Sequence, residues 1–501
     1  MKKTIEISPF NRVEGDLKIS VEIDNGRVIN AHAAGVMFRG FEIILKERDP
    51  MDALVFTPRI CGICGMAHST AASNALKSAF KAEIPPNGYL ARNIAFACEN
   101  AMSHPTAFYA LFAIDFANKK YADIPEYSEL VKCFAALKGS SYIGAVKERK
   151  RFLEILGLFV GKWPNTLAFQ PGGTTKPIIM SEITRSLGIL ADFKNFVEEV
   201  MLHCSIERWL ENKSLKDVEN WLGEHSHLNG DLGLFIKVGR DLGLEKIGKG
   251  PEKFLSYGVY DLPDGTTWLP SGYYDGDFHH FNQNLISEHI KHSWFNGYEG
   301  GKHPLEGITL PDADKQGAYS WAKSPRYDNN VVEVGPLARL IIDKDPLIID
   351  LAKNFGTNVY TRTLARLHET VRLIKQMEKW ILEINPDEPF YIKPIIPENA
   401  QGIGLTEAAR GALGHWINIE NGKIKNYQVI TPTAWNISPR DSNDNPGAIE
   451  QALIGTLVAD EKNPVEVAHV IRSFDPCLVC TVHAYRSDKL LTTFNDRDIY
   501  D

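Results

Sequence analysis

The sequence predicts an α+β protein that is predominantly helical, with a central helical bundle and small peripheral β-sheets. The helical part is indicated by residues 359–384, where apolar side chains recur at spacings of three and four residues until Asn385-Pro386 ends the pattern. The sheets are indicated by two hairpin turns, Asp24-Asn25-Gly26 and Glu420-Asn421-Gly422, which lie between strand-like runs. At 501 residues the chain exceeds the usual size of one simple core, so we expect two or more fused lobes.

The first half of the chain divides into two segments. Residues 1–57 are expected to be β-rich, because residues 17–23 alternate apolar and polar side chains ahead of the first hairpin turn. Residues 58–220 are expected to be helical and to carry a first pair of cysteines. The Ala-rich stretch from 67 to 82 predicts the helix that follows this pair.

The second half of the chain contains three segments that differ in composition and in expected structure. Residues 221–330 are rich in Gly, Pro, Asp, His and Tyr and lose periodicity, which predicts long ordered loops. Residues 331–483 combine the long helix, the second hairpin and a second pair of cysteines. Residues 484–501 form a C-terminal extension.

Composition excludes several classes of protein. An apolar content of 44% with 24% charged residues is typical of a folded globular protein, and a net charge of −8 gives no basic footprint for nucleic acid. We find no transmembrane segment, and residues 1–6 lack the apolar region of a signal peptide. We therefore expect a cytoplasmic or peripherally membrane-associated protein, with export bound to a partner subunit as the open alternative.

Two Cys-x-x-Cys pairs, Cys61/Cys64 and Cys477/Cys480, are the strongest functional signal. Seven cysteines is an odd and low count, which argues against a disulfide framework and leaves thiols available as ligands. Each spacing lets two sulfurs face one metal, and four thiolates complete a tetrahedral set for a soft redox metal. More than 400 residues separate the pairs, so the whole fold would assemble this site in its interior. From spacing alone, a structural zinc site stays open.

The residues around both pairs resemble the large, catalytic subunit of nickel–iron hydrogenases, of an uptake type. The matching segments are Arg59-Ile60-Cys61-Gly62-Ile63-Cys64 with His68, and Asp475-Pro476-Cys477-Leu478-Val479-Cys480 with His483. Further matches lie at residues 11–15, 38–42, 325–328, 333–339, 409–415 and 432–436. The resemblance implies reversible heterolytic cleavage of dihydrogen into protons and electrons, mainly in the direction of oxidation. The alternatives are a regulatory hydrogen sensor with the same site and a structural zinc-binding protein.

The resemblance also implies a nickel–iron centre with carbon monoxide and cyanide on the iron. Cys61 and Cys477 would be terminal nickel ligands, while Cys64 and Cys480 would bridge nickel and iron. The terminal thiolate of Cys477 would double as the first proton acceptor.

The same resemblance implies roles for six other residues. Glu14 would relay the proton, and Arg410 would overhang the gas-binding position beside the carboxylate of Asp475. Pro432 and Thr433 would line the iron, the Thr433 hydroxyl donating to a cyanide, and His68 would tune a metal-bound sulfur.

A second metal and two protein partners are implied as well. Glu42, the backbone carbonyl of Val429 and His483 match a magnesium site. Cys98, Cys133 and Cys204 occur singly within expected helices and cannot form Cys₄ sets, so electrons would leave through an iron–sulfur small subunit in a heterodimer. A maturation protease would remove residues 484–501 after His483.

The chain departs from the family pattern at three positions near the site. Ser103 stands where an aspartate is common, Ala107 where a histidine is common, and Ala409 where a proline is common. These changes bear on gas affinity, direction and oxygen sensitivity.

Five histidines between 279 and 303 invite a second metal site but match no ligand set of the family: His279, His280, His289, His292 and His303. We expect structural or surface roles, with His289 and His292 on one helix face.

Overall fold

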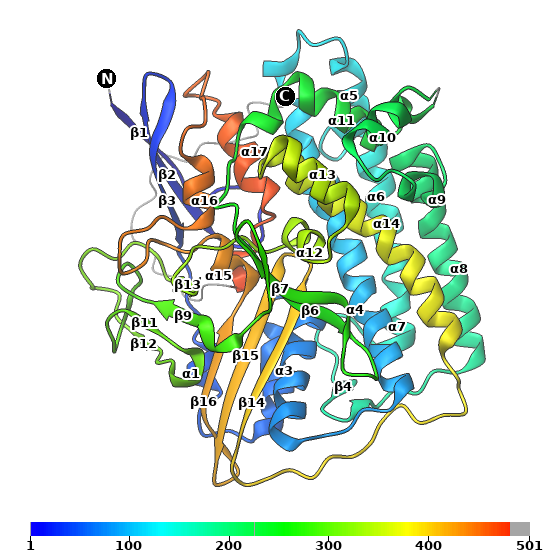
Figure 1. Cartoon of the computed structure of the whole chain (residues 1–501), viewed down its shortest axis with the longest axis vertical. Helices are drawn as coiled ribbons and strands as arrows, with labels where there is room; N and C mark the ends of the chain where they lie inside the picture. Colours follow the sequence, from blue (N-terminus) through cyan, green and yellow to red (C-terminus); the bar gives the residue numbers. More distant parts are fainter. Residues whose placement is uncertain (1, 225, 481–501) are drawn as a thin grey trace.

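The computed structural model describes residues 2–224 and 226–480. A lobe of helices lies beside a set of small sheets, with the helices on the right and the N-terminal sheet at the upper left in Figure 1. This arrangement confirms the predicted α+β architecture. Within the described residues, no helix combines the length and the apolar composition needed to cross a membrane.

The helical lobe is built around α14 (Val359–Glu383), which packs against α4 (Pro86–Thr106). The predicted helix over 359–384 is confirmed, because its apolar positions are buried against neighbouring helices and Asn358 caps its first turn. The lobe also contains α5 (Tyr127–Phe134), α6 (Ser140–Phe152), α7 (Glu154–Val160), α8 (Met180–Phe196), α9 (Ile206–Leu210), α10 (Leu215–Leu222), α11 (Asp231–Asp241), α12 (Pro336–Ile342) and α13 (Pro346–Phe355).

Two three-stranded antiparallel sheets confirm the predicted hairpins. One contains β1 (Lys3–Ile7), β2 (Leu17–Asp24) and β3 (Arg27–Gly35), and the other contains β14 (Ala400–Ala408), β15 (Gly411–Glu420) and β16 (Lys423–Ile430). The turns fall at Asn25-Gly26 and Asn421-Gly422, where all four residues have positive φ. These are the residues that such turns require.

The helix α3 (Gly65–Phe80) lies directly on β14, as Figure 1 shows at the lower centre. Two glycines of the strand permit this approach: a Cβ on Gly402 would stand 2.1 Å from the carbonyl oxygen of Ala75, and one on Gly404 would stand 2.0 Å from that of Ala71. The Ala-rich composition that predicted the helix also gives it a flat face. The contact fixes where α3 begins, next to the first cysteine pair.

The stretch from 221 to 330 contains more regular structure than the expected loops. It holds α11 and an antiparallel hairpin of β6 (Phe254–Asp261) and β7 (Thr267–Tyr274), extended by β8 (Phe278–His279). Seven of the eight residues of β6 are buried, so the strand has no polar face and no alternating pattern. A strand covered on both faces gives no period-2 signal.

Several short strands and helices complete the fold. Another three-stranded sheet has the order β11 (Gly301–Lys302), β9 (Ile286–His289) and β13 (Ser324–Tyr327). Two small ladders pair β4 (Phe169–Gln170) with β5 (Gly173–Thr174) and β10 (Phe295–Asn296) with β12 (Leu310–Pro311). The remaining helices are α1 (Phe41–Ile44), α2 (Ala53–Phe56), α15 (Pro432–Asn436), α16 (Ala448–Leu453) and α17 (Val465–Ser473).

A buried carboxyl in the helical lobe gives a testable pH dependence. Asp231 accepts hydrogen bonds from Tyr109 (2.8 Å) and Ser141 (3.0 Å), yet burial raises the pKa of its carboxyl to about 7. Unfolded aspartate ionises near pH ~4, so the stabilising effect of the protonated form is complete below that pH and is lost as the pH rises to about 7. For Asp231→Asn we expect a flatter dependence of the melting temperature on pH between 5 and 7.5 than in the wild type. Equal slopes in thermal melts of both proteins would contradict this account.

Candidate metal centre

The first cysteine pair lies between a short turn and α3. The 3₁₀ turn Thr57–Arg59 leads into Cys61, and Cys64 is the residue that caps α3. The carboxylate of Glu99, from α4, accepts hydrogen bonds from the backbone N–H groups of Met66 (2.8 Å) and Ala67 (3.0 Å). An acceptor at these otherwise unpaired donors fixes the start of the helix, and with it the orientation of Cys64.

The second pair is held by the N-terminal segment of the chain. Glu14 and Cys477 form a parallel β-bridge, in which Glu14 N donates to Pro476 O (3.2 Å) and Leu478 N donates to Glu14 O (2.6 Å). The hydroxyl of Thr433, on α15, accepts from Cys477 N at 3.0 Å. Cys477 is therefore anchored through its backbone on two sides, which leaves its side chain to point into the site.

These elements bring the sulfurs of Cys61, Cys64 and Cys477 together in the interior. The three Sγ atoms lie within 4.8 Å of one another, with Cys61 at 3.3 Å from Cys477 and 2.7 Å from Cys64. All three side chains are at most 5% exposed. Cys480 lies in the 3₁₀ turn Leu478–Cys480, one turn beyond Cys477, and nothing is described of its side chain. Among residues 2–224 and 226–480, this is the one group of three or more His, Cys, Asp or Glu side chains that lie close enough to share a metal ion.

Arg39 connects the two cysteine segments, a role that the sequence did not reveal. Its guanidinium donates to the carbonyl oxygens of Arg59 (3.2 Å) and Ile60, just before Cys61, and to that of Val479 (2.6 Å). A planar guanidinium can bridge several carbonyls in fixed directions. Its partners are backbone atoms, so no side-chain pattern could have indicated them.

Gly15 is required where the N-terminal segment meets the second pair. Its φ is +84°, and a Cβ at this position would stand 2.7 Å from Val479 N. A methyl group here would push residues 477–480 away from Glu14 and strain the backbone.

For Gly15→Ala we therefore expect a folded protein that binds less nickel. Metal analysis checks this, with Gly265→Ala as the control, because Gly265 also has positive φ but has nothing within 4 Å of the added Cβ. Equal nickel in the two variants would show that the approach at Gly15 does not govern the site.

Three charged residues surround the sulfurs, as the resemblance implies for Glu14, Arg410 and Asp475. Arg410 Nε donates to the backbone oxygen of Asp475 (2.9 Å) and Nη2 to its carboxylate (3.1 Å). The two side chains are buried, and Arg410 Nη1 and Asp475 Oδ2 have no hydrogen-bond partner in the described part of the chain. Because orphaned buried polar atoms are costly, both are suited to face a bound group.

The charges of this cluster shift the pKa of its members. Burial, the thiolate of Cys61 and the carboxylate of Asp475 raise the pKa of Glu14, while Arg410 opposes them. Burial lowers the pKa of Arg410, but the carboxylate of Asp475 and the three thiolates outweigh it and hold this pKa well above its ordinary value, so the guanidinium stays charged. The site thus combines a permanent cation with a carboxyl whose proton is released less readily than usual.

His68 and Thr433 lie beside the cysteines as expected. His68 stands on α3 one turn after Cys64, whose carbonyl accepts its backbone N–H at 3.2 Å, and the side chain is 1% exposed. Pro432 opens α15, directly before Thr433.

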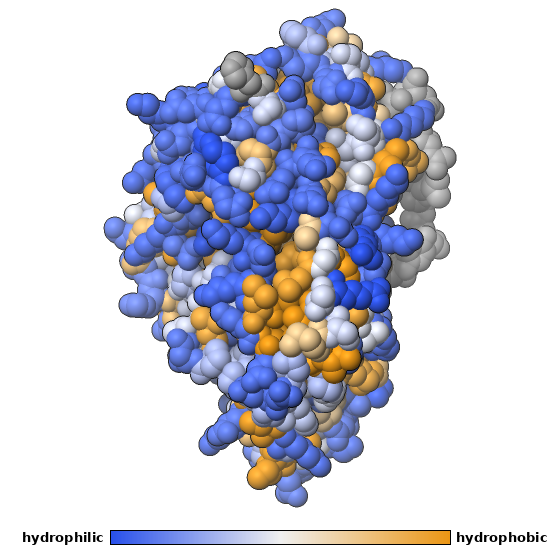
Figure 2. Space-filling view, turned by 90° about the vertical axis from the view of Figure 1, so that its right-hand side faces the viewer, coloured by the Kyte–Doolittle hydropathy of each residue, from blue (hydrophilic) through white to orange (hydrophobic). Residues whose placement is uncertain are grey.

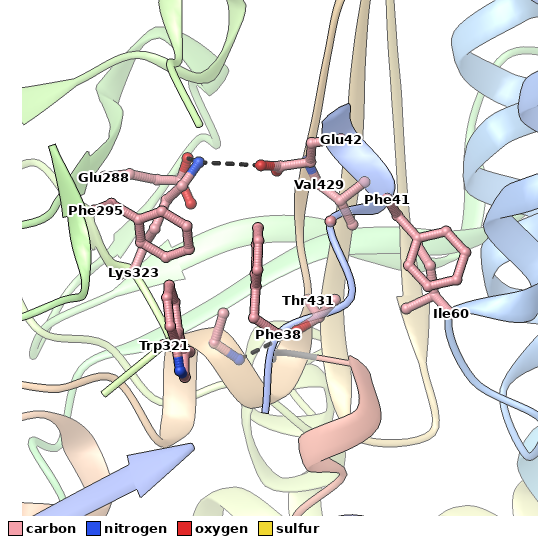
Figure 3. Close-up of a pocket in the computed structure, with 12 residues that line it drawn as sticks. Phe38, Phe41, Glu42, Ile60, Glu288, Phe295, Trp321, Lys323, Val429 and Thr431 are labelled. Atoms are coloured by element: carbon pink, nitrogen blue, oxygen red, sulfur yellow. Dashed lines mark hydrogen bonds and ion pairs between the residues drawn. The ribbon is translucent and has the colours of Figure 1, made fainter. Parts of the chain in front are cut away.

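One pocket contains two of the three residues expected to bind magnesium, Glu42 and Val429. Glu42 Oε1 accepts from Val429 N (2.9 Å), and Oε2 faces the ammonium of Lys323 (3.3 Å), which lies 3.5 Å from Glu288. Figure 3 shows Glu42 and Lys323 pointing toward each other across the pocket, with Phe38, Trp321 and Phe295 along one side. Lys323 and Glu288 were not predicted. The third expected ligand, His483, lies outside the described residues, as do residues 484–501.

Two expectations about isolated residues are wrong. His289 ends strand β9, paired on both sides by β11 and β13, so it shares no helix face with His292. The two rings bond different partners, Ser442 (3.0 Å) and Asp444 (2.6 Å). Cys204 lies in a bend between helices and is only partly buried, whereas Cys98 and Cys133 are buried within α4 and α5 as expected.

Comparisons with known proteins show the family of the chain. The family model of the nickel-dependent hydrogenases matches residues 39–136 and 119–483. The chain is 34% identical over 522 residues to the periplasmic NiFeSe hydrogenase large subunit of Desulfomicrobium baculatum, covering 97% of this chain and 96% of that protein. It is 30% identical over 583 residues to the uptake hydrogenase large subunit of Rhodobacter capsulatus, with 97% and 96% covered.

The fold is likewise similar to that of a solved structure, the H2-activated NiFeSe hydrogenase of Desulfomicrobium baculatum. The TM-score is 0.84 at 33% identity, and the match covers 96% of this chain and 100% of that one. The structural zinc site that spacing left open is set aside by the family match. The chain belongs to the nickel-dependent hydrogenase family, as a catalytic large subunit.

Proposed function

We propose that this large subunit oxidises dihydrogen in the uptake direction at a nickel–iron centre held by Cys61, Cys64, Cys477 and Cys480. The observation that carries the proposal is the convergence of three cysteine sulfurs with Arg410 and Asp475 in the buried interior. Soft thiolates fit nickel and low-spin iron, and a nickel–iron pair with carbon monoxide and cyanide on the iron would supply the electron-accepting site at which dihydrogen is polarised.

The chain's own residues would perform the proton chemistry. The Cys477 thiolate takes the first proton, and Glu14, whose backbone pairs with Cys477, passes it toward the surface. Burial is the main cause of the raised pKa of Glu14, which makes its carboxylate a better proton acceptor than that of an ordinary glutamate. Arg410, fixed by two bonds to Asp475, presents its remaining N–H group over the substrate position.

Elemental analysis combined with infrared spectroscopy tests the composition of the centre. In the large subunit separated from the iron–sulfur partner we expect nickel and iron in equal amounts, with bands of metal-bound carbon monoxide and cyanide that disappear in Cys64→Ser. Zinc in their place, or nickel without these bands, would reject the nickel–iron centre. Dihydrogen-dependent reduction of a redox dye then separates an uptake enzyme from a hydrogen sensor, because only the enzyme sustains turnover.

The pocket around Glu42 is proposed to hold a magnesium ion together with the backbone carbonyl of Val429 and with His483. Oxygen ligands suit this hard cation. Glu42 and Glu288 supply two carboxyl groups against the single ammonium of Lys323, and burial raises the pKa of Glu288 to about 7, so the pocket gains a net negative charge that favours a cation as the pH rises past that value. Prolonged chelation should therefore lower the melting temperature, and added magnesium should restore it.

An iron–sulfur small subunit is proposed to carry electrons away. Beyond the proposed nickel ligands the chain has only Cys98, Cys133 and Cys204, too few for a Cys₄ cluster. Figure 2 shows a contiguous apolar area bordered by hydrophilic residues, on the side where α8 lies in Figure 1. An apolar area of this kind is typical of protein interfaces and supports a protein partner.

We further propose that a maturation protease removes residues 484–501.

A further inference from the structure

The turn that carries Arg410 has a backbone geometry that β-hairpins disfavour. Strands β14 and β15 pair as far as Ala408 and Gly411, so Ala409 and Arg410 form a two-residue loop. Loops of this length favour types I′ and II′, and both types need a positive φ at the first loop residue. Neither Ala409 nor Arg410 has a positive φ. Contacts from outside the hairpin must therefore help to hold the backbone of Arg410 in place.

Arg339, on α12, makes such contacts. Its guanidinium donates to the carbonyl oxygens of Ala408 (2.8 Å) and Ala409 (3.3 Å), the two residues before Arg410. It also donates to the carboxyl group of Glu407 at 3.2 Å, so one side chain binds three consecutive residues. Figure 1 shows α12 beside the upper end of this hairpin. Arg339 is fully buried, where hydrogen bonds are electrostatically stronger than in water.

Glu369, on α14, orients the guanidinium of Arg339. Its carboxylate accepts from Nε at 3.1 Å and from Nη2 at 2.9 and 3.0 Å, a paired arrangement that fixes the plane of the guanidinium. The guanidinium is thus held by two carboxyl groups and two carbonyl oxygens. The ammonium of a lysine lacks the planar fork that these acceptors fit. Through Arg339, the turn is therefore tied to the long helix of the helical lobe.

We propose that Arg339 is a positioning residue for Arg410. The side chain of Arg410 is bonded to Asp475, while the carbonyl groups just before it are held by Arg339. If the turn shifted by about 1 Å, Arg410 Nη1 would leave the substrate position, and misplacements of this size can lower a rate by about 100-fold. The inference rests on the proposed function for the substrate position alone, because the contacts that place the turn do not involve the metal.

A crystal structure of Arg339→Lys in the assembled, nickel-loaded enzyme tests the position directly. We expect the turn to be displaced and at least one of the bonds between Arg410 and Asp475 to be lost. Arg326→Lys is the matched control, because Arg326 is also fully buried but bonds Asp441 (2.9 Å) and backbone carbonyls outside the turn. The control should leave the turn in its wild-type place.

A double-mutant cycle separates positioning from general destabilisation. Arg339→Lys should lower turnover per nickel by about 10- to 100-fold in the wild type and have no further effect in Arg410→Lys, because both changes remove the same positioned donor. A purely structural role would lower turnover by the same factor in both backgrounds. If Arg339→Lys does not fold, Glu369→Gln takes its place in both measurements, since glutamine keeps the size of the side chain but loses the paired arrangement.

A turn that keeps its wild-type place in the variant, or losses of turnover that multiply in the double variant, would overturn the inference. If Arg410→Lys by itself kept wild-type turnover, the proposed role of Arg410 would fail instead. The crystal structure would then still decide whether Arg339 places the turn, because that comparison depends neither on turnover nor on the identity of the metal.

Discussion

Substituting Arg410 by lysine is expected to lower dihydrogen oxidation by at least about 100-fold while nickel content stays near that of the wild type. The guanidinium makes two hydrogen bonds to Asp475, at 2.9 and 3.1 Å, and still has Nη1 left over. A lysine ammonium is a point charge on a flexible stem and cannot hold both bonds while presenting a third donor. The change removes a positioned donor and keeps the charge, so catalysis should fall more than metal binding.

Turnover with a redox dye, expressed per nickel, measures this effect. Arg372→Lys is the matched control, since Arg372 also bonds two acidic neighbours, Asp343 (2.7 Å) and Asp345 (3.2 Å), but lies on the outer side of α14 at a different pocket. It should keep wild-type turnover. If Arg410→Lys turned over as fast as the control at equal nickel content, Arg410 would have no part in catalysis.

Substituting Glu14 by glutamine is expected to lower turnover by about 10²- to 10⁴-fold, the usual contribution of a positioned acid–base group. Glutamine keeps the size of the side chain but cannot carry a proton away. The bonds of residue 14 to Pro476 and Leu478 involve its backbone, so the substitution should leave the second cysteine segment in place. We therefore expect normal nickel content with blocked proton transfer.

The pH dependence of turnover adds a second readout for Glu14. Burial is the main cause of its raised pKa, and the charge of Cys61 contributes. The relay needs the carboxylate as acceptor, so wild-type turnover should decline as the pH falls through this raised pKa. The decline should be absent from the residual activity of Glu14→Gln. Glu6→Gln serves as the control, because Glu6 lies on β1 in the same N-terminal part of the chain and its carboxylate pairs with Lys18. An unchanged rate in Glu14→Gln would assign the relay to another group.

The sequence predicted those parts of the fold whose signals are local. The period of α14 and the Asn-Gly turns of both hairpins appear in the structure at the expected residues. The strand β6 escaped prediction because it is buried on both faces and its side chains do not alternate. His289 escaped because its pairing partners, β11 and β13, are distant in sequence.

The candidate site likewise contains some residues that the sequence could predict and others that it could not. Cys61, Cys64 and Cys477 could be grouped from their spacing, and the structure brings their sulfurs together. Glu99 and Arg39 could not be found, because they act on backbone N–H and C=O groups that carry no sequence signal. Ser103 is buried on α4 one residue before His104, and nothing in the structure explains why serine stands there.

The central claim is that cysteines from both ends of the chain hold a nickel ion. X-ray absorption at the nickel edge, recorded on purified protein that oxidises dihydrogen, tests it most directly. We expect a nickel site surrounded by four sulfur atoms, reduced to three in a Cys477→Ser protein that still binds the metal. Nickel bound mainly by nitrogen and oxygen, or a sulfur shell unchanged by Cys477→Ser, would contradict it.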